Sequence, residues 1–413
     1  MTVWTPEWSI QINGTTEYAN LTIANMTVTS GRTDIYSQAI AGYASLEILN
    51  LNLSTVVFDV NDSILVRVKD SAGAYVNIYG GFINSVTNQV ISSGTGGVNE
   101  SILITALGAL SKLPKSLTDG ILAKDFDGNQ IEEILSEVLF LNWINYPSVT
   151  WAGSDPAVTW EDAGNNGLGE IDTPGDYELA ARSSSRTDIY SLVSFLATSG
   201  LGYLYEDAFG RISYADSTHR TEYLTANGYT YVSANDALAA GIQTSRKLGD
   251  LRNSVTIKYK NDAEVSASDL ESILQYGRQA AIISTSIEDG TDAQSQADFY
   301  LSIRAFPQDQ FTQITYTLGN PELDDGDRDS LLNVFMGLPL DISDLPVNMV
   351  DGRFQGFVEG WSWRTGYNRL DLTLTLSPVA YSLQATRWNG VSVAESWNTI
   401  ENTLTWNNAI FVA

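Results

Sequence analysis

The sequence contains no cysteine, which excludes disulfide bonds, thiolate catalysis and cysteine-ligated zinc or iron–sulfur sites. It contains a single histidine, His219. The neighbouring residues, Ser217 to Arg220, lack the nucleophile elbow of a serine hydrolase. The sequence therefore disfavours a Ser-His-Asp triad, and we expect His219 to lie in a surface turn.

Basic residues are also scarce. Lys and Arg together number 22 against 49 Asp and Glu, which gives a formal net charge of -27 at pH 7. A surface with this charge repels nucleic acid and anionic lipid. We therefore expect no specific recognition of DNA.

Long apolar runs are missing as well. No window is long enough to span a bilayer, and the N-terminus has no basic segment followed by an apolar run. We expect a chain that is made in a cytosol and does not insert into a membrane. Because 413 residues exceed the usual size of one hydrophobic core, about two to four domains are predicted.

Two regions have the periodicity of β-strands. From Trp4 to about Ser92, apolar and polar residues alternate between turn signals, as at residues 44–48 and 64–68. The same pattern returns from Asn253 onward. A period of two with frequent turns predicts antiparallel strands in both regions.

The segment between these regions has a different periodicity. We predict a short helix at residues 99–110 and a second helix at residues 129–139, where apolar residues recur at helical spacing. A third helix is predicted just after Thr187, and a hairpin at residues 202–215. The pattern indicates an α/β insertion between two β regions.

The hexapeptide Arg-Thr-Asp-Ile-Tyr-Ser occurs twice, at residues 32–37 and 186–191. The first copy follows Gly31 and leads into a predicted strand, whereas the second follows a serine run and opens a predicted helix. Context decides the structure of so short a string. Because the flanks do not align, a duplicated module is disfavoured, and chance in a chain rich in Thr, Ser and Tyr is the remaining interpretation.

Two acidic turns, at residues 125–129 and 324–329, resemble fragments of calcium loops but lack the ligand spacing of an EF-hand. We interpret them as solvated turns and expect no metal and no cofactor. The many carboxylates and ten tryptophans also fit a carbohydrate-binding or glycoside-cleaving β protein, which needs two carboxylates beside a sugar. This class is kept as an alternative.

The C-terminal segment repeats a Trp-Asn pair every nine residues, at Trp388, Trp397 and Trp406. A segment of this length cannot bury three indoles by itself. We therefore predict a docking arm at residues 387–413, whose tryptophans pack on a neighbouring subunit or another protein. Packing on the second β region of the same chain is the alternative.

Several short motifs occur in an order that resembles the tail-tip (baseplate) hub proteins of long-tailed phages, especially minor tail proteins of actinobacteriophages. The motifs are Gly31-Arg32, Ala41-Gly42, Leu49-Asn50, Ile78 to Ile83, Gly202 to Ile212, Leu251 to Tyr259, Gly356 to Gly360 and Leu376 to Pro378. The resemblance spans most of the chain. No lysozyme or peptidase domain is recognisable, and we expect no enzymatic activity.

The resemblance implies a mainly β fold with an α/β insertion, in which each chain has two tail-tube-like β-barrels and one inserted α/β domain. Mapped onto this sequence, it predicts a first barrel at 1–97, the insertion at 98–250, a second barrel at 251–386 and the docking arm at 387–413. Three chains would then form a pseudo-sixfold ring.

The resemblance also implies a function and partners. The chain would be a structural virion protein, synthesised in the host bacterial cytoplasm, that forms a homotrimeric hub between the sixfold tail and threefold tip components. The distal tail ring protein would lie above it, tip or fibre proteins below it and the tape measure protein in its lumen. DNA would pass through without specific binding, in agreement with the acidic charge.

Five residues are candidates for assembly contacts: Gly31, Arg32, Trp388, Trp397 and Trp406. A distal tail ring protein of the same tail, which would be hexameric, is the alternative within phage biology. The long α/β insertion favours the hub.

Overall fold

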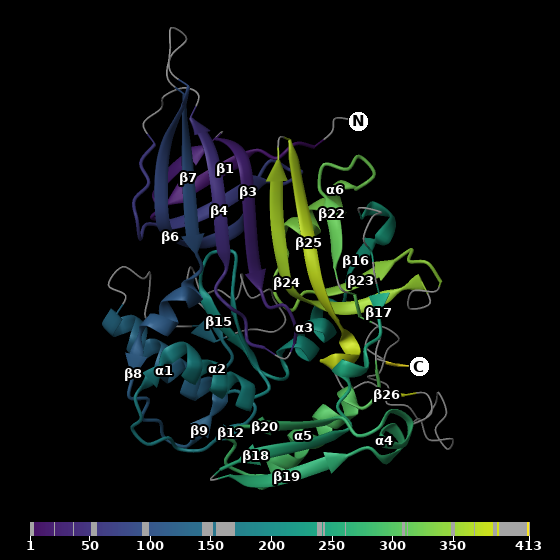
Figure 1. Cartoon of the computed structure of the whole chain (residues 1–413). Helices are drawn as coiled ribbons and strands as arrows, with labels where there is room; N and C mark the ends of the chain where they lie inside the picture. The colour runs from purple at the N-terminus through teal and green to yellow at the C-terminus, as the bar shows by residue number, and fades with distance from the viewer. Residues whose placement is uncertain are drawn as a thin grey trace.

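The computed structural model is mainly β, with 43% strand and 24% helix (Figure 1). This confirms the predicted fold class at that level. The structure describes residues 4–19, 21–35, 37–50, 56–92, 99–142, 152–153, 170–237, 242, 244–260, 262–307, 310–311, 313–347, 352–366, 368–382, 386–387 and 411–412.

The largest sheet has 12 strands among the described residues and lies in the upper part of Figure 1. Its main path runs β16-β23-β24-β3-β4-β7-β6-β5-β1-β2, and β25 joins β24 to β22. The N-terminal strands are β1 (Trp8–Ile12), β2 (Thr16–Ala19), β3 (Thr22–Gly31), β4 (Tyr43–Asn50), β5 (Ser63–Lys69), β6 (Tyr75–Ser92) and β7 (Asn99–Leu107). The others are β16 (Thr230–Ser233), β22 (Ile314–Thr317), β23 (Pro339–Ser343), β24 (Phe354–Gly366) and β25 (Arg369–Pro378). Alternate residues are buried, such as Ala44, Leu46 and Ile48 on β4, as the period of two predicts.

The pairing of β3 with β24 joins the two β regions. The register runs from Gly31 opposite Gly360 to Met26 opposite Thr365. The expectation of two tail-tube-like barrels is not confirmed, because none of the sheets among the described residues is closed into a barrel. The physical reason is that the second edge of β3 pairs with β24 instead of another N-terminal strand, which makes one continuous sheet.

The predicted helix at residues 99–110 is wrong. Residues 99–107 form β7, which pairs with both β4 and β6. Its buried residues, Ile102, Ile104 and Ala106, recur with a period of two, and two of them are β-branched. Pairing on both edges outweighs the helical propensity of the leucines and alanines.

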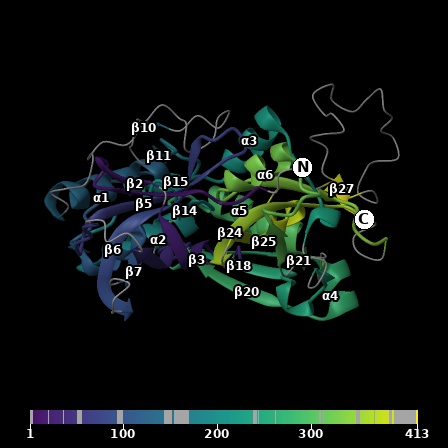
Figure 2. The same cartoon turned by 90° about the horizontal axis from the view of Figure 1, so that it is seen from above.

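The other two helices predicted for the middle segment, and its hairpin, are present. The elements are η1 (Ala109–Lys115), β8 (Leu117–Thr118), β9 (Asp125–Phe126), α1 (Asp127–Asn142), β10 (Ala152–Gly153), β11 (Glu170–Ile171), β12 (Glu178–Leu179), β13 (Thr187–Asp188), α2 (Ile189–Ser199), β14 (Tyr203–Glu206), β15 (Ile212–Ala215) and α3 (His219–Asn227). Helices α1 and α2 pack together and bury Ile131, Ile134 and Val193. They lie at the same end of the molecule as the N-terminal strands (Figure 2).

A smaller lobe lies below the C-terminal strands in Figure 1. Strands β18 (Ser254–Tyr259), β19 (Ala263–Ser268) and β20 (Ala280–Ser284) form a three-stranded sheet, and α5 (Gly290–Arg304) packs on it. The remaining elements are η2 (Ala234–Asp236), β17 (Thr244–Ser245), η3 (Leu248–Asp250), α4 (Leu270–Tyr276), β21 (Gln310–Phe311), α6 (Asp325–Leu332), η5 (Val379–Tyr381), β26 (Thr386–Arg387) and β27 (Phe411–Val412). The division at residues 97, 250 and 386 stays a prediction.

Within the described ranges, none of the helices has both the length and the apolar character needed to cross a membrane.

Candidate functional site

The candidate site begins where the end of β3 approaches β24. Gly31 has a φ of +83°, in the left-handed region that favours glycine. A Cβ atom on Gly31 would lie 2.6 Å from the Gly360 Cα and would overlap the Glu359 carbonyl oxygen. The Arg32 N–H donates to that same carbonyl at 2.8 Å. The close backbone approach therefore requires glycine at position 31, and it delivers the Arg32 side chain to β24.

Glu359 binds two arginines from distant parts of the chain. Its carboxylate accepts from Arg32 Nε at 2.6 Å and from Arg220 Nη1 and Nη2 at 2.8 and 3.1 Å. Ser377 on β25 donates its hydroxyl to the same carboxylate. The side chains of Arg32, Arg220 and Glu359 are 7%, 6% and 1% exposed. This cluster, which we call the junction cluster, ties β3, α3 and β24 together.

Burial and charge oppose each other in the junction cluster. Burial alone would raise the pKa of Glu359, but the charges of Arg220 and Arg32, with the hydrogen bonds, lower it to about 2. Burial lowers the pKa of Arg32, and the Glu359 charge opposes that fall. At Arg220 burial acts to lower the pKa, but the charge of Glu359 and the hydrogen bonds to its carboxylate outweigh burial, so the pKa is raised. All three groups stay ionised at neutral pH, which leaves one positive charge in excess.

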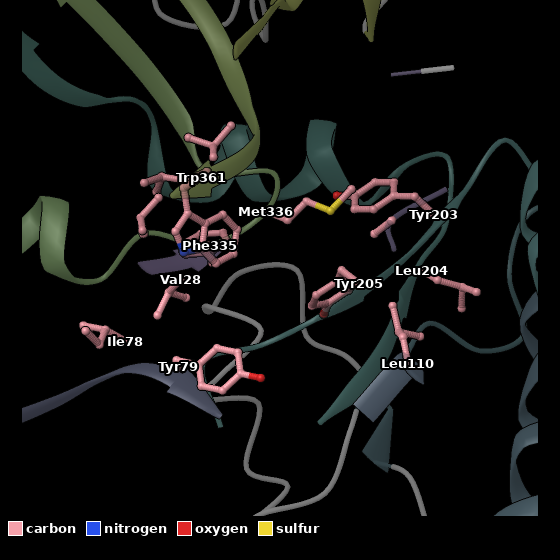
Figure 3. Close-up of a cluster of buried hydrophobic side chains, with 14 of the residues drawn as sticks. Val28, Ile78, Tyr79, Leu110, Tyr203, Leu204, Tyr205, Phe335, Met336 and Trp361 are labelled. Carbon is pink, nitrogen blue, oxygen red and sulfur yellow. The ribbon is translucent and has the colours of Figure 1, made fainter. Parts of the chain in front are cut away.

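The ring of Tyr203 on β14 lies against both guanidinium groups. Its centroid is 5.1 Å from Arg32 Cζ and 4.5 Å from Arg220 Cζ, and the Phe357 ring is 5.0 Å from Arg220 Cζ. Such cation–π contacts add attraction and keep water out. Figure 3 shows Tyr203 in one buried cluster with Tyr205, Tyr79, Met336 and Trp361. The β14–β15 hairpin therefore packs against both β regions.

The hairpin also contacts the N-terminal sheet through Glu206. The buried Glu206 carboxylate accepts from the Gly42 N–H at 2.7 Å and from the Leu110 N–H. A Cβ atom on Gly108 would overlap this carboxylate. Burial raises the pKa of Glu206 to about 7, although the two N–H groups oppose the rise. One carboxylate thus fixes the ends of two strands, β4 at its start and β7 at its end.

The turn of the hairpin lies directly on β6. Asp207 and Arg211 form a buried ion pair across the turn, and Gly210 has a φ of +76°. A Cβ atom on Gly80 would lie 2.6 Å from the Phe209 carbonyl oxygen. Glycine at position 80 lets the two backbones touch.

Most of the motifs singled out in the sequence therefore meet in one place. Those in the junction cluster and the hairpin contacts are Gly31-Arg32, Ala41-Gly42, Ile78 to Ile83, Gly202 to Ile212 and Gly356 to Gly360. Their contacts described above are within one chain. An additional role of Gly31 and Arg32 in contacts between chains stays a prediction.

His219 is not in a surface turn as expected. It is 1% exposed at the start of α3, and its Nδ1 lies 2.7 Å from Asp172 Oδ2. The neighbouring Ser217 donates its hydroxyl to Asp176. The His219–Asp172 pair fixes the start of α3, one residue before Arg220. His219 is buried, in spite of the polar sequence around it, because the Asp172 carboxylate gives its ring a buried hydrogen-bond partner.

The two acidic turns act as helix starts. Asp324 accepts from the Asp327 N–H at 2.8 Å as the cap of α6, and Asp125 accepts from Asn129 Nδ2 at 2.9 Å before α1. Within the part of the chain that the structure describes, no group of three His, Cys, Asp or Glu side chains could hold a metal ion. Trp388, Trp397 and Trp406 lie outside the described residues.

A groove of about 260 Å³ borders the junction cluster. It is lined by the loop after β3, the ends of α2 and α5, the start of α3, and β18 and β20. Arg32 and Arg220 belong to both the groove lining and the junction cluster, and Tyr203, which packs on both guanidinium groups, also lines the groove.

Sequence reasoning singled out Gly31 and Arg32, as candidates for assembly contacts, and missed Arg220 and Glu359. The sequence around Glu359 contained a signal: one charged residue stands between Val358 and Gly360 in the otherwise apolar stretch 357–361. In the structure Glu359 and both of these neighbours are buried. Arg220 had no such signal, since a basic residue beside a lone histidine in a polar segment is typical of a surface.

No family model matches this sequence, and no curated protein matches it. Solved structures, however, share its fold. The tail protein from Neisseria meningitidis MC58 is 10% identical, with a TM-score of 0.58 over 92% of this chain and 98% of that one. The 43 kDa tail protein of prophage MuSo2 from Shewanella oneidensis is 11% identical, with a TM-score of 0.52 over 90% and 98%. This chain therefore shares its fold with these two tail proteins over 90% or more of its length.

Proposed function

We propose that this chain is a structural phage tail protein and, within the tail, the homotrimeric hub of the tail tip. The observation that carries the proposal is the match of its fold to two tail proteins, over 92% and 90% of this chain. The junction cluster supports it, because Arg32, Arg220 and Glu359 hold two β regions of one chain in a fixed relation. Three such chains present six β regions, the number that a pseudo-sixfold ring below a sixfold tail needs.

In this proposal the hub joins the sixfold tail to threefold tip components. The distal tail ring protein lies above it, tip or fibre proteins lie below it, and the tape measure protein occupies the lumen. The arm with Trp388, Trp397 and Trp406 docks on a neighbouring subunit or a tip protein, with the indoles as anchors. The chain is made in the bacterial host cytoplasm and acts at the virion tail tip, as a minor tail protein of the actinobacteriophage type.

The negative charge of the chain is compatible with a channel through which DNA passes. We propose no enzymatic role. A net charge of -27 removes the counterion-release attraction that would hold DNA to the wall. We propose that acidic side chains are in excess on the inner surface of the ring, so that DNA passes without specific binding.

Symmetry tests the proposal. Electron microscopy of tails that contain this chain should show a threefold ring of three copies at the tip. A ring of six copies would support the distal tail ring protein instead. Retention on polysaccharide columns, or release of sugars from them, would support the carbohydrate-binding or glycoside-cleaving alternative.

A further inference from the structure

The second half of strand β6 has an edge that pairs with no other described strand. Strand β6 pairs with β5 only as far as Phe82, whereas it pairs with β7 as far as Ser92. Within the described part of the chain, residues 84–92 therefore have a strand partner on one side only. The unpaired side is the one away from β7 and β4 (Figure 1). Such an edge offers backbone N–H and C=O groups to a further strand.

This open edge, residues 84–92, lacks most of the features that keep strands of different molecules apart. It contains no charged residue, no proline and no glycine. Between Asp70 and Glu100 there is no Lys, Arg, Asp or Glu at all, although 17% of the chain is charged. Two register shifts lie near the ends of the open edge and leave Ser85 to Val90 in regular pairing with β7. The edge is therefore suited to pairing with another strand.

The side chains of the open edge are accessible as well. Eight of the nine are exposed, and Val86 is half-buried. Val90 and Ile91 are 58% and 53% exposed. Together with Thr87 these residues are β-branched, which favours a strand conformation. Apolar side chains at such an edge gain stability when they pack against those of a second strand.

We propose that the open edge pairs with the same edge of a second copy of this chain, antiparallel and around a twofold axis at Asn88. Charge favours a second copy of this segment, because two chains with a net charge of -27 repel each other least where both contact surfaces are neutral. Length favours it too, since β2 and β16, the end strands of the main path, have only four residues each. A twofold contact is separate from the threefold ring proposed above, so its test does not depend on that ring.

The position of the axis follows from the side chains. An axis at Asn88 places Asn88 opposite its own copy and Val86 opposite Val90 of the second copy. It also places Thr87 opposite Gln89, so that apolar residues meet apolar residues and polar residues meet polar ones. An axis at Thr87 would instead place Val86 opposite Asn88.

Sedimentation equilibrium of the full chain tests the pairing. A strand pair makes a small interface, so we expect a weak dimer at about 10 to 200 µM chain and about 0.15 M salt, which screens the net charge. Asn88→Asp should weaken dimerisation at least about tenfold, because two carboxylates then lie opposite each other at the axis. Asn84→Asp adds the same charge, but its two copies lie about 26 Å apart, so dimerisation should change less than about threefold.

Disulfide crosslinking tests the axis itself. Because the chain has no cysteine, each single-cysteine variant reports one position. Under mild oxidation Asn88→Cys should form a disulfide-linked dimer, since opposite Cβ atoms of a strand pair lie about 4.5 to 5.5 Å apart and need only a small adjustment. Asn84→Cys should remain monomeric, because the second cysteine is out of reach.

The outcomes separate this contact from others. A chain that stays monomeric at about 200 µM, with no crosslinking of Asn88→Cys, would overturn the proposal. Equal effects of the two aspartate variants, or equal crosslinking of the two cysteine variants, would also overturn it, since the contact would then lie on another surface or in another register. Positions 84 and 88 are both exposed, so all four variants should melt within about 2 °C of the parent chain.

Discussion

The two copies of Arg-Thr-Asp-Ile-Tyr-Ser have opposite environments. In the first copy Arg32 is buried in the junction cluster, and its Nη1 also donates to the Ser37 carbonyl at 3.2 Å. In the second copy the Arg186 side chain is 68% exposed, 3.4 Å from Asp119 Oδ1. Identical residues thus serve a tertiary junction at one place and a solvated surface at the other.

One local feature is nevertheless common to both copies. The aspartate accepts from the backbone N–H three residues later, Asp34 from Ser37 at 3.1 Å and Asp188 from Ser191 at 2.9 Å. In the second copy this bond caps α2, and in the first it closes a turn. The comparison separates what six residues encode by themselves, a capping bond, from what the rest of the chain imposes, the burial of the arginine.

The largest expected effect comes from removing each arginine in turn. Arg32→Ala should lower the free energy of unfolding by about 3 to 5 kcal/mol, because it leaves part of a buried charge cluster without its partner. Arg186→Ala should change it by less than about 0.5 kcal/mol, since an exposed pair contributes little. Urea denaturation followed by tryptophan fluorescence measures both. Similar losses in the two variants would show that burial does not distinguish the copies.

Acid should reduce the stability that Arg32 of the first copy gains from its ion pair with Glu359. The pKa of Glu359 is lowered from 4.5 to about 2 by the charges of Arg220 and Arg32 acting against burial. A lowered folded pKa gives stability that is present above pH 4.5 and is lost as the pH falls through 2. The loss should be about 3 kcal/mol, and Glu359→Gln should remove this part of the pH dependence.

Glu206 provides the control with the opposite sign. Burial raises its pKa from 4.5 to about 7, so its contribution is present below pH 4.5 and is lost as the pH rises through 7. Burial also raises the pKa of Asp127 to about 7 and the pKa of Asp216 to about 6, so these two groups change the stability in the same direction. The melting temperature plotted against pH should therefore have a maximum at about pH 4, below which the Glu359 contribution is lost and above which the three raised carboxyl groups lose theirs. Glu206→Gln should reduce the fall on the neutral side only. A maximum that stays unchanged in both glutamine variants would contradict the assignment.

A smaller effect is expected at the glycine that introduces the first copy. Gly31 and Gly73 have the same φ of +83°, but a Cβ atom at Gly31 meets β24, whereas none of the described atoms lies within 4 Å of one at Gly73. Gly73→Ala should cost about 1 kcal/mol for the left-handed backbone alone. Gly31→Ala should cost about 2 kcal/mol more, because β3 and β24 must separate. Equal costs, measured by urea denaturation, would show that the close approach is not required.

The sequence alone predicted the elements whose signal is local. The alternation in β4 and β5, the helical spacing in α1 and α2, and the turn at Gly210 all depend on neighbours within a few residues. The helix prediction for residues 99–107 failed because a short apolar run without clear alternation occurs both in buried strands and in buried helices. Pairing with β4 and β6, which decides it, connects residues as many as 64 apart, such as Tyr43 and Leu107.

The junction cluster shows the same limit. Gly31-Arg32 could be singled out as a pair, but Glu359 lies 327 residues from Arg32 and 139 from Arg220. No periodicity connects residues at such separations. The burial of His219 beside Asp172 was missed for the same reason, since the partner is 47 residues away.

The smallest expected effect concerns the capping bond that both copies share. Asp188→Ala should lower the free energy of unfolding by about 1 kcal/mol, because the first turn of α2 loses its side-chain cap. Asp34→Ala should cost less than about 0.5 kcal/mol, since its bond closes an exposed turn in which water can replace the carboxylate. Amide hydrogen exchange at Ser191 and Ser37 reports each bond directly, and exchange should accelerate only at the serine whose own aspartate is removed. If Asp34→Ala proves the more damaging of the two, the turn after β3 contributes to the junction cluster through more than its arginine.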